Sequence, residues 1–372
     1  RNRGRPLLRF AKPTGVMVQG SSPHEGLEIT AQGLFEHVVM EDCIPVSGDY
    51  PVDDQGVLGR VVDKQRPEEE LLQRAYRMGV RLAEMTKLVK VGRLAVASTL
   101  PDIYWYSTTQ LGEVERPTAP NLGTDARYLD LLANYPMKLK LFAINASPRA
   151  PRQSNSQILL DAAKEGAQEA GGVEFVEYSF ARKKIAPCRM CISYCSKHLE
   201  CVNKDDFQEF CEHWLGSEGV VWGAPVYHMG PPAIVRAAMD RMSELRFQTR
   251  VARQQRQYPR LTKPVGAIVQ GGSRFGGQEI TLQFFMQHAL LFQCVPVTGN
   301  MPESYLGVAA QVRSRESLLA DEETLAQSRS LGQRVAEMAR ILKAGKILLQ
   351  DSLPEEYFPT LQMGYSERRA IE

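Results

Sequence analysis

The pattern of apolar and polar positions along residues 137–346 alternates between two periods. Short apolar runs predict buried strands, and apolar residues recurring every three or four positions predict helices that pack on them. Strands are expected at Leu139–Ile144, Val173–Tyr178, Gly219–Gly223, Val265–Gln270 and Cys294–Val297. Helices are expected at Asn155–Ala170, Pro232–Ser243, Gln278–Phe292 and Glu322–Leu342. This alternation predicts an α/β fold with a doubly wound, five-stranded parallel sheet and helices on both faces.

The sequence also contains an internal repeat. Lys12-Pro-Thr-Gly-Val-Met-Val-Gln-Gly20 matches Lys263-Pro-Val-Gly-Ala-Ile-Val-Gln-Gly271, and the same offset of 251 residues holds onward to Gly48 and Gly299. After a slip of two residues, the helix around Gly79 matches the helix around Gly332. We therefore predict a partial half-domain at 1–93 that duplicates 252–346, a linker at 94–136, a complete domain at 137–346 and a C-terminal tail at 347–372.

The predicted half-domain contains only the fourth and fifth strands of such a sheet, with their helices. Two strands leave a hydrogen-bonding edge open and apolar surface uncovered. The apolar helix positions Leu34, Phe35, Val38 and Val39 need a partner. The sequence thus predicts that other residues, upstream of Arg1 or in another polypeptide, complete a second domain that packs on the first as two subunits would.

Composition narrows the classes of protein that the chain can represent. Hydrophobic residues make up 43% and charged residues 24% of the 372 residues, which predicts packed cores. A formal net charge of +2 gives no reason to expect nucleic acid as a partner. No apolar run approaches the ~20 residues of a membrane span. Four of the seven cysteines are clustered, which favours a metal site over a disulfide framework and predicts a cytoplasmic location.

The clustered cysteines are Cys188, Cys191, Cys195 and Cys201, separated by two, three and five residues. Four thiolates in so short a segment are able to enclose one metal centre, and the turns between them are too short for two independent disulfides to be the simple interpretation. An iron–sulfur cluster, a zinc ion and metal-free thiols all remain open at this point.

Three loops are predicted at the carboxyl ends of the strands, where doubly wound sheets bind ligands. The first, residues 145–156, is rich in hydroxyl groups and leads into a helix whose N-terminus attracts phosphate. It lacks the glycine patterns of nucleoside triphosphate and dinucleotide sites. Ordinary helix capping by Ser154 or Asn155 is the alternative interpretation.

The second and third loops contain glycines and aromatic residues. Tyr227 and His228 follow the third strand and are placed to lie against a flat ring, while Gly271 and Gly272 follow the fourth strand and allow backbone amides to approach the polar edge of that ring. An ordinary tyrosine at the edge of the core and a solvated loop histidine are the alternatives.

Residues ~137–346 resemble the flavodoxin-like NADPH-dependent FMN reductase superfamily, and within it the iron–sulfur flavoproteins. The features that carry the resemblance are the Ser-Pro-Arg and Ser-Asn-Ser elements of the first loop, the Ala-Pro-Val-Tyr loop with Asp240-Arg241 downstream, the Gly-Gly-Ser-Arg loop, and the cysteine segment that ends in Cys-Val-Asn-Lys-Asp-Asp. The resemblance implies FMN and a [4Fe–4S] cluster, and assembly as a dimer or tetramer.

The resemblance also implies which residues bind these groups. The residues implied for FMN are Ser147, Arg149, Arg152, Ser154, Asn155, Ser156, Pro225, Val226, Tyr227, His228, Met229, Gly230, Gly271, Gly272, Ser273, Arg274 and Gly277. The residues implied for the cluster are Cys188, Cys191, Cys195 and Cys201. One feature departs from the family pattern: three residues, not the usual two, separate the second and third cysteines.

Three functions are consistent with these features. The preferred one is an oxidoreductase that transfers electrons through FMN and a [4Fe–4S] cluster, with NAD(P)H or a small redox protein as donor. The second is an NAD(P)H-dependent FMN or quinone reductase with zinc or no metal at the cysteines. The third is a non-catalytic, flavin-bearing subunit of a larger redox complex. The expected assembly is a homo-oligomer or such a complex, without nucleic acid or a membrane span.

Overall fold

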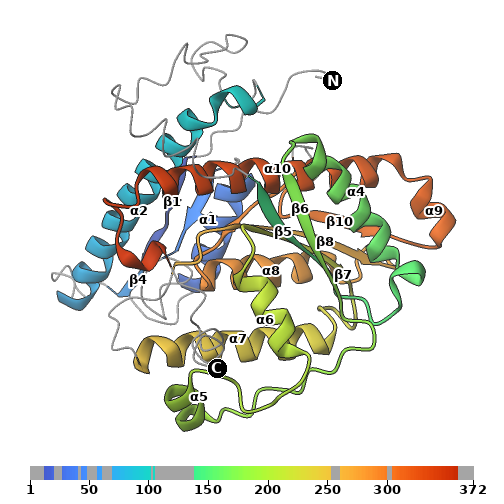
Figure 1. Cartoon of the computed structure of the whole chain (residues 1–372), viewed down its shortest axis with the longest axis horizontal. Coiled ribbons are helices and arrows are strands. Elements are labelled where there is room, and N and C mark those ends of the chain that lie inside the picture. The colour runs from blue at the N-terminus through green and yellow to red at the C-terminus, as the bar shows by residue number, and fades with distance from the viewer. Residues whose placement is uncertain are drawn as a thin grey trace.

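Residues 138–358 form a parallel β-sheet covered by helices on both faces in the computed structural model (Figure 1). The structure describes residues 12–20, 27–40, 43–47, 57–60, 69–101, 104, 138–252, 260–299 and 304–358. The strands of this sheet are β5 (Leu139–Asn145), β6 (Val173–Ser179), β7 (Gly219–Pro225), β8 (Pro264–Gly271), β9 (Val295–Pro296) and β10 (Val308–Gln311). The helices are α4 (Asn155–Glu169), α5 (Ile192–His198), α6 (Phe207–Leu215), α7 (Ala233–Ala252), α8 (Gln278–Leu291), α9 (Arg315–Leu319) and α10 (Glu322–Leu348), with short 3-10 helices η3 (Pro151–Gln153) and η4 (Glu355–Tyr357).

The strand order of this sheet is that of flavodoxin-like proteins. β6, β5, β7 and β8 lie side by side in that order, and β10 lies beyond β8 with all pairings parallel. Taken in chain order, this is the 2-1-3-4-5 arrangement. The α/β fold class predicted from the sequence is therefore confirmed.

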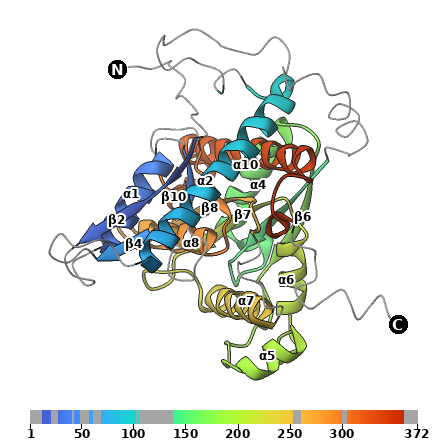
Figure 2. The ribbon, with the colours of Figure 1, turned by 90° about the vertical axis from the view of Figure 1, so that its left-hand side faces the viewer.

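Alternating residues of each strand build two separate cores. Leu141 of β5 faces the core beneath α4 and α10, whereas Phe142 faces the core beneath α6, α7 and α8. Figure 2 shows these helices on the two sides of the sheet. Because β5, β7 and β8 are buried on both faces, their apolar runs are nearly continuous in sequence.

Two glycines bring α4 and α10 unusually close together. A Cβ atom added at Gly332 would lie 1.8 Å from the carbonyl oxygen of Ala163, and one added at Gly166 would lie 2.0 Å from that of Arg329. Any larger residue at either position would force the helices apart.

The fifth strand position differs from the sequence prediction of one strand at Cys294–Val297. β9 spans only Val295–Pro296 and pairs with the start of β8, while β10 pairs with its end. The two pieces are separated by residues 297–307. β10 was not predicted because its four residues, Val-Ala-Ala-Gln, carry too little apolar periodicity to stand out.

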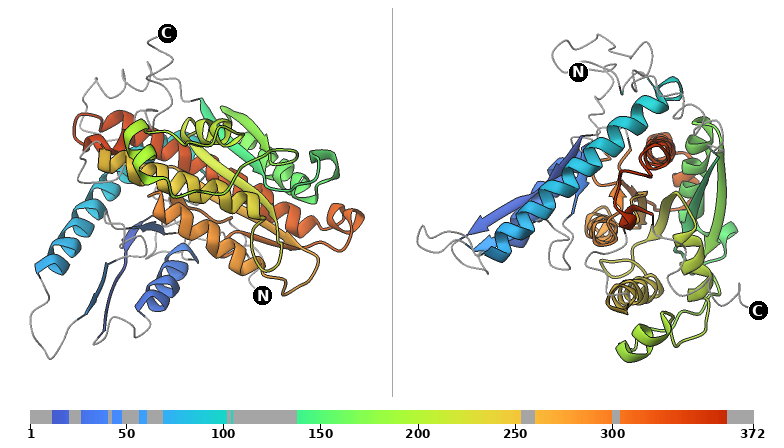
Figure 3. Two further views of the ribbon diagram at one scale, coloured as in Figure 1. Left: turned by 90° about the horizontal axis from the view of Figure 1, so that it is seen from below. Right: turned by 60° about the vertical axis from the view of Figure 1, so that its left-hand side comes forward.

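The N-terminal part of the chain repeats the second half of this unit element by element. Its elements are β1 (Pro13–Gly15), β2 (Met17–Gly20), α1 (Leu27–Met40), β3 (Ile44–Val46), β4 (Val57–Arg60) and α2 (Glu69–Ala95), followed by η1 (Ala97–Thr99). We call the described residues of 12–104 the N-terminal copy, those of 260–358 the C-terminal copy, and those of 138–358 the complete unit. Figure 3 shows the short strands of the N-terminal copy between α1 and α2.

Strand pairing is the same in the two copies. Pro13 pairs with Ile44 as Pro264 pairs with Val295, and both pairs are related by the offset of 251 residues. β2 and β4 likewise pair in the register of β8 and β10. The repeat found in the sequence is thus also a repeat of secondary structure and register.

The two copies contact each other through equivalent residues. A Cβ atom at Gly92 of α2 would lie 1.9 Å from the carbonyl oxygen of Ile341, and one at Gly345 of α10 would lie 2.4 Å from that of Leu88. Gly345 is the equivalent of Gly92, and Ile341 is the equivalent of Leu88. Such reciprocal contacts are those of an isologous, dimer-like interface within one chain.

The same relation holds where α1 meets α8. Phe35 and Val39 of α1 pack with Met286 and Leu290 of α8. Met286 is the equivalent of Phe35, and Leu290 is the equivalent of Val39. Three of the four apolar positions predicted to need a partner, Phe35, Val38 and Val39, therefore bury against the complete unit.

The repeat continues beyond both long helices. Leu100-Pro101 and Tyr104 match Leu353-Pro354 and Tyr357. Tyr104 lies at the Arg334 and Glu337 side chains of α10, and its hydroxyl donates to a Glu337 carboxylate oxygen at 3.0 Å. α2 and α10 extend two residues past 93 and 346, the limits predicted for the half-domain and the complete domain. Most of the predicted linker and the last part of the predicted tail lie outside the described residues.

Candidate functional site

Three loops from distant parts of the sequence meet around one cavity at the carboxyl ends of the strands. The cavity has a volume of about 270 Å³ and lies where β5, β7, β8 and β10 end. Its lining residues are Ser147, Arg149, Asn155, Pro225, Val226, Tyr227, Gln270, Gly271, Gly272, Val312 and Arg313. The fold therefore gathers the loops that the sequence singled out at one edge of the sheet.

The first loop is organised by Asn145, the buried last residue of β5. Its Oδ1 atom accepts hydrogen bonds from the Ser147 amide at 3.0 Å and from the Ser154 hydroxyl at 3.3 Å. Ser154 precedes α4 as its N-cap residue, but its side chain makes no capping hydrogen bond. This geometry differs from ordinary helix capping and leaves the start of α4, at Asn155, facing the cavity.

The second loop is a tight turn. Tyr227 and Gly230 exchange backbone hydrogen bonds of 2.8 and 3.1 Å, and His228 and Met229 between them have φ angles of 47° and 66°. L-residues rarely adopt this left-handed region, at a cost on the order of 1 kcal/mol each. The turn leaves the Tyr227 side chain 47% exposed beside the cavity.

The third loop is fixed by Gly277 and Gln278. Gly277 has a φ angle of 105°, and a Cβ atom there would lie 2.6 Å from the Met229 Cα atom, so only glycine lets the second and third loops touch. The buried Gln278 side chain donates to the Ser273 carbonyl at 2.6 Å and accepts from the Gly276 amide at 2.9 Å. These two hydrogen bonds fix the conformation of the third loop.

The structure divides the predicted flavin residues into two groups. The predicted residues that line the cavity are Ser147, Arg149, Asn155, Pro225, Val226, Tyr227, Gly271 and Gly272. The predicted residues that do not line it are Arg152, Ser154, Ser156, His228, Met229, Gly230, Ser273, Arg274 and Gly277. Sequence reasoning missed Gln270, Val312 and Arg313 as lining residues; the last two follow β10, whose strand the sequence did not reveal.

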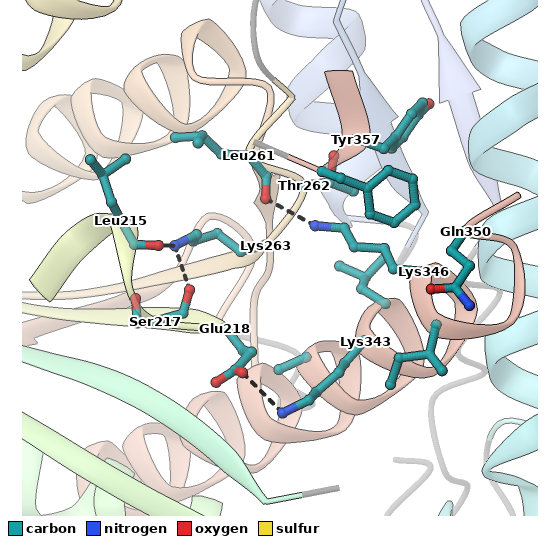
Figure 4. A pocket seen from close by; sticks show the side chains of 14 residues that line it. Leu215, Ser217, Glu218, Leu261, Thr262, Lys263, Lys343, Lys346, Gln350 and Tyr357 are labelled. Carbon is teal, nitrogen blue, oxygen red and sulfur yellow. Dashed lines mark hydrogen bonds and ion pairs between the residues drawn. The ribbon is translucent and has the colours of Figure 1, made fainter. Parts of the chain in front are cut away.

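A larger cavity of about 420 Å³ opens at the opposite ends of the strands (Figure 4). The side chain of Lys263 points at the end of α6, where it donates to the Trp214 carbonyl at 2.6 Å and the Leu215 carbonyl at 3.2 Å. Burial lowers the pKa of Lys263 to about 8. Because Lys343 also pairs with Glu218 at 2.9 Å, the cations around this cavity are engaged in holding the fold.

The four clustered cysteines lie in a segment, residues 188–201, whose helix α5 packs against α7. Cys195 and Cys201 are buried, while Cys188 and Cys191 are partly exposed. Burial, followed by the nearby Cys191, raises the pKa of Cys195 to about 12. Cys201 and Cys188 add to this effect.

Arg241 of α7 holds the end of this segment in place. Its Nε atom donates to the Cys201 sulfur at 3.2 Å, and its Nη1 atom pairs with both carboxylate oxygens of Asp205 at 2.8 Å. Burial opposes ionisation of Asp205, but the hydrogen bond from Arg241 and two backbone amides outweigh it and hold the carboxyl pKa below its ordinary value. The acidic residue behind the cysteines therefore clamps the segment to α7.

The donor set of this segment suits a thiolate-ligated metal centre. Four cysteines provide the number and type of ligands that iron–sulfur clusters and structural zinc require, and Arg241 provides a hydrogen bond to one of them. In the described part of the chain, however, no three His, Cys, Asp or Glu side chains are arranged so that they could hold one metal ion. The four cysteines of this segment form no disulfide in the structure.

Comparison with known proteins gives consistent matches. The family model for NADPH-dependent FMN reductase matches residues 139–303. An iron–sulfur flavoprotein of Methanocaldococcus jannaschii is 30% identical over 207 residues, which are 55% of this chain and 100% of the relative. An iron–sulfur flavoprotein of Archaeoglobus fulgidus is 35% identical over 200 residues, 53% of this chain and 96% of the relative. A solved flavone reductase is 20% identical and covers 55% of this chain and 64% of its own, with a TM-score of 0.40, which supports no further conclusion.

The parallel sheet, the cavity at its strand ends and the family match define a flavodoxin-like oxidoreductase. The chain belongs to the NADPH-dependent FMN reductase family, and within it to the iron–sulfur flavoproteins. None of the helices that the structure describes has the length and apolar character needed to cross a membrane.

Proposed function

We propose that this protein transfers electrons through FMN, bound in the cavity of about 270 Å³, and through a [4Fe–4S] cluster bound by Cys188, Cys191, Cys195 and Cys201. The convergence of three loops on a single cavity at the strand ends carries the proposal. The similarity to iron–sulfur flavoproteins of two archaea supports it.

Different residues of the cavity are placed to bind different parts of FMN. Ser147, Arg149 and Asn155 surround the start of α4, where backbone amides and the helix dipole favour a phosphate. Tyr227 lies beside the cavity with its ring half-exposed and is placed to cover one face of an isoalloxazine ring. The Gly271 and Gly272 amides can approach its polar edge. Bound FMN supplies the exchange between two-electron and one-electron transfer.

The cysteine segment and the cavity are connected through α7. The Tyr227 turn leads into the first residues of this helix, and Arg241, which contacts Cys201, lies eight residues after Ala233. That separation corresponds to about 12 Å along the helix axis. In the proposed holoprotein, Arg241 orients Cys201 and places a hydrogen-bond donor at its sulfur.

The flavin site is tested by exchange of Asn155 for leucine. A bulky apolar side chain at the start of α4 should remove the phosphate position and lower the flavin content of the purified protein at least about tenfold. Gln153→Leu, at an exposed position of η3, is the control and should keep one flavin per chain. Equal flavin content in both variants would mean that the phosphate lies elsewhere.

The cluster is tested by metal analysis of protein purified without oxygen. We expect about four iron atoms per chain, lost in Cys191→Ser and retained in Cys43→Ser, which lies outside the cysteine segment. One equivalent of zinc without iron would contradict the cluster and support a second function.

That second function is an NAD(P)H-dependent FMN or quinone reductase with zinc or no metal at the cysteines. The observation in favour of its metal-free form is that no three potential ligands among the described residues are arranged to hold a metal ion. Rapid reduction of the flavin by NAD(P)H in metal-free protein would favour this function, since no cluster is then needed.

The same proposal includes the electron donor, the assembly and the location of the protein. A small redox protein or NAD(P)H supplies electrons, and the protein works as a homo-oligomer or as a subunit of a redox complex. The four clustered cysteines, which form no disulfide, suit the reducing cytoplasm. Gel filtration together with activity of the isolated protein separates a homo-oligomeric enzyme from a subunit that requires a larger assembly.

A further inference from the structure

The N-terminal copy has an open face whose equivalent in the complete unit is covered. We define the open face by Met17, Leu34, Leu72 and Gly79. Met17 is 65%, Leu34 43% and Leu72 46% exposed. Met17 and Leu72 are equivalent to residues of the core beneath α4 and α10, whereas Leu34 is equivalent to a residue of the core beneath α6, α7 and α8, so the open face has exposed apolar residues on both sides of the β1 and β2 strands.

The equivalent residues show what covers such a face. Ile268, the equivalent of Met17, is 0% exposed in the core beneath α4. Phe285, the equivalent of Leu34, is 2% exposed because it stacks on Trp222 of β7, with ring centroids 4.9 Å apart. Leu325, the equivalent of Leu72, is 8% exposed in the core beneath α4. Residues 138–252, which we call the first half of the complete unit, thus bury the equivalent face.

Gly79 gives the sharpest evidence for a docked helix. Its equivalent Gly332 is the position where α4 approaches so closely that a Cβ atom would lie 1.8 Å from the Ala163 carbonyl oxygen. A Cβ atom at Gly79 would meet no atom of the described residues within 4 Å. Glycine in the interior of a helix costs about 1 kcal/mol relative to alanine, and a helix contact would explain it.

The strand edge gives the same indication. In the complete unit, β8 pairs with β7 on one side and with β9 and β10 on the other. Within the described residues, β1 and β2 pair only with β3 and β4, so the edge equivalent to the β7 side has no partner there. An unpaired parallel strand edge beside an apolar face is suited to the addition of a strand.

We propose that the open face binds a flavodoxin-like first half, a segment with the strand–helix fold of residues 138–252. Its central strand pairs with the free edge of β1 and β2, and its first helix docks on Gly79 as α4 docks on Gly332. The bound segment and the N-terminal copy together form a second flavodoxin-like unit against the complete unit.

A second molecule of this chain does not fit this role. The described residues contain two second halves and one first half, residues 138–252, and that first half already covers the complete unit. Self-association would therefore leave the open face without a strand and helix of the right kind.

The first test measures hydrogen exchange in the full chain. The α2 peptide around Gly79 should exchange at least about tenfold faster than the α10 peptide around Gly332, because among the described residues a neighbouring helix covers Gly332 but not Gly79. Equal protection would mean that the chain's own remaining residues cover the open face, and it would overturn the proposal.

The second test supplies a first half to the N-terminal copy. In a tandem chain, a further copy of residues 138–251 is joined ahead of residue 1, which reproduces the order and the 251-residue offset of the complete unit. Protection of the α2 peptide should then rise at least about tenfold. Gly79→Leu should abolish the gain in the tandem chain and should not lower α2 protection in the original chain.

The control variant is Gly33→Leu, because a Cβ atom at Gly33 also meets no described atom within 4 Å and its equivalent is Phe284 rather than a glycine. It should leave the gain in the tandem chain unchanged. A tandem chain that folds with its first unit unprotected, or an original chain that buries α2 by dimerising, contradicts the proposed occupant.

Discussion

Leu34 and Phe285 occupy equivalent positions in α1 and α8, yet Leu34 is 43% exposed and Phe285 is 2% exposed. Gly79 and Gly332 differ in the same way, because only Gly332 contacts another helix. The two copies share their elements and strand register. The difference shows that a covering segment, rather than the residue or its helix, determines burial here.

The copies also show what does not depend on that covering segment. Each presents the same glycine, Gly92 or Gly345, to the long helix of the other. The dimer-like contact between the copies therefore forms although one of them has no first half among the described residues. The two copies can therefore pack on each other even where a first half does not cover one of them among the described residues.

The largest expected effect on stability concerns the equivalent glycines of α10 and α2. Gly332→Leu should cost more than about 4 kcal/mol of unfolding free energy or prevent folding, because the new side chain would meet the backbone of α4. Gly79→Leu should instead stabilise the chain by about 0.5–1 kcal/mol through helix propensity. Urea unfolding measures both, and similar losses from the two variants would contradict the open position of Gly79.

A smaller effect is expected at the aromatic position. Phe285→Ala should cost about 3–5 kcal/mol, because it leaves a cavity beside Trp222 in a close-packed core. Leu34→Ala, its equivalent, should cost less than about 1 kcal/mol. Near-ultraviolet circular dichroism and urea midpoints of the two variants provide the measurement, and a large loss at Leu34 would show that this side chain is covered in solution.

The smallest effect concerns a pair of histidines. Burial, and next the charge of Arg236, lowers the pKa of His288 from 6.5 to about 4. Between these pH values the unfolded chain binds a proton that the folded chain does not, so stability falls on acidification by at most about 3 kcal/mol from this group.

His288→Gln should remove that part of the acid destabilisation and leave the profile above pH ~6.5 unchanged in shape. His37→Gln, at the exposed equivalent position in α1, is the matched control. Unfolding free energies measured from pH ~7 to ~4 test the pair, and identical slopes in the two variants would refute the role of His288.

Much of the fold was accessible from sequence because parallel strands buried on both faces leave continuous apolar runs. β5, β7 and β8 were predicted within one or two residues. β10 was not, since Val308–Gln311 is short and joins the sheet only by pairing with β8. The repeat also extends to Tyr104 and Tyr357, and the long-range contact of Tyr104 with Glu337 of α10 marks it more clearly than the local sequence.

The candidate site, like the fold, was predictable from the sequence only in part. Its three loops are continuous in sequence and carry recognisable residues, such as Ser147 and Tyr227. Arg313 escaped prediction because it follows the unpredicted strand β10. The function of Arg241 as a clamp on Cys201 and Asp205 depends on α7 crossing the cysteine segment, a contact between residues about forty positions apart.

The sequence by itself determined most of the alternating strands and helices and the duplication, because these depend on local periodicity. It also predicted residues for a flavin and a metal, because such predictions follow from side-chain chemistry. Only the tertiary structure decided that α2 packs on α10 through Gly92 and Gly345, and that Gly79 faces no described neighbour. Burial and contact depend on which segments meet in space, and equivalent sequences meet different neighbours in the two copies.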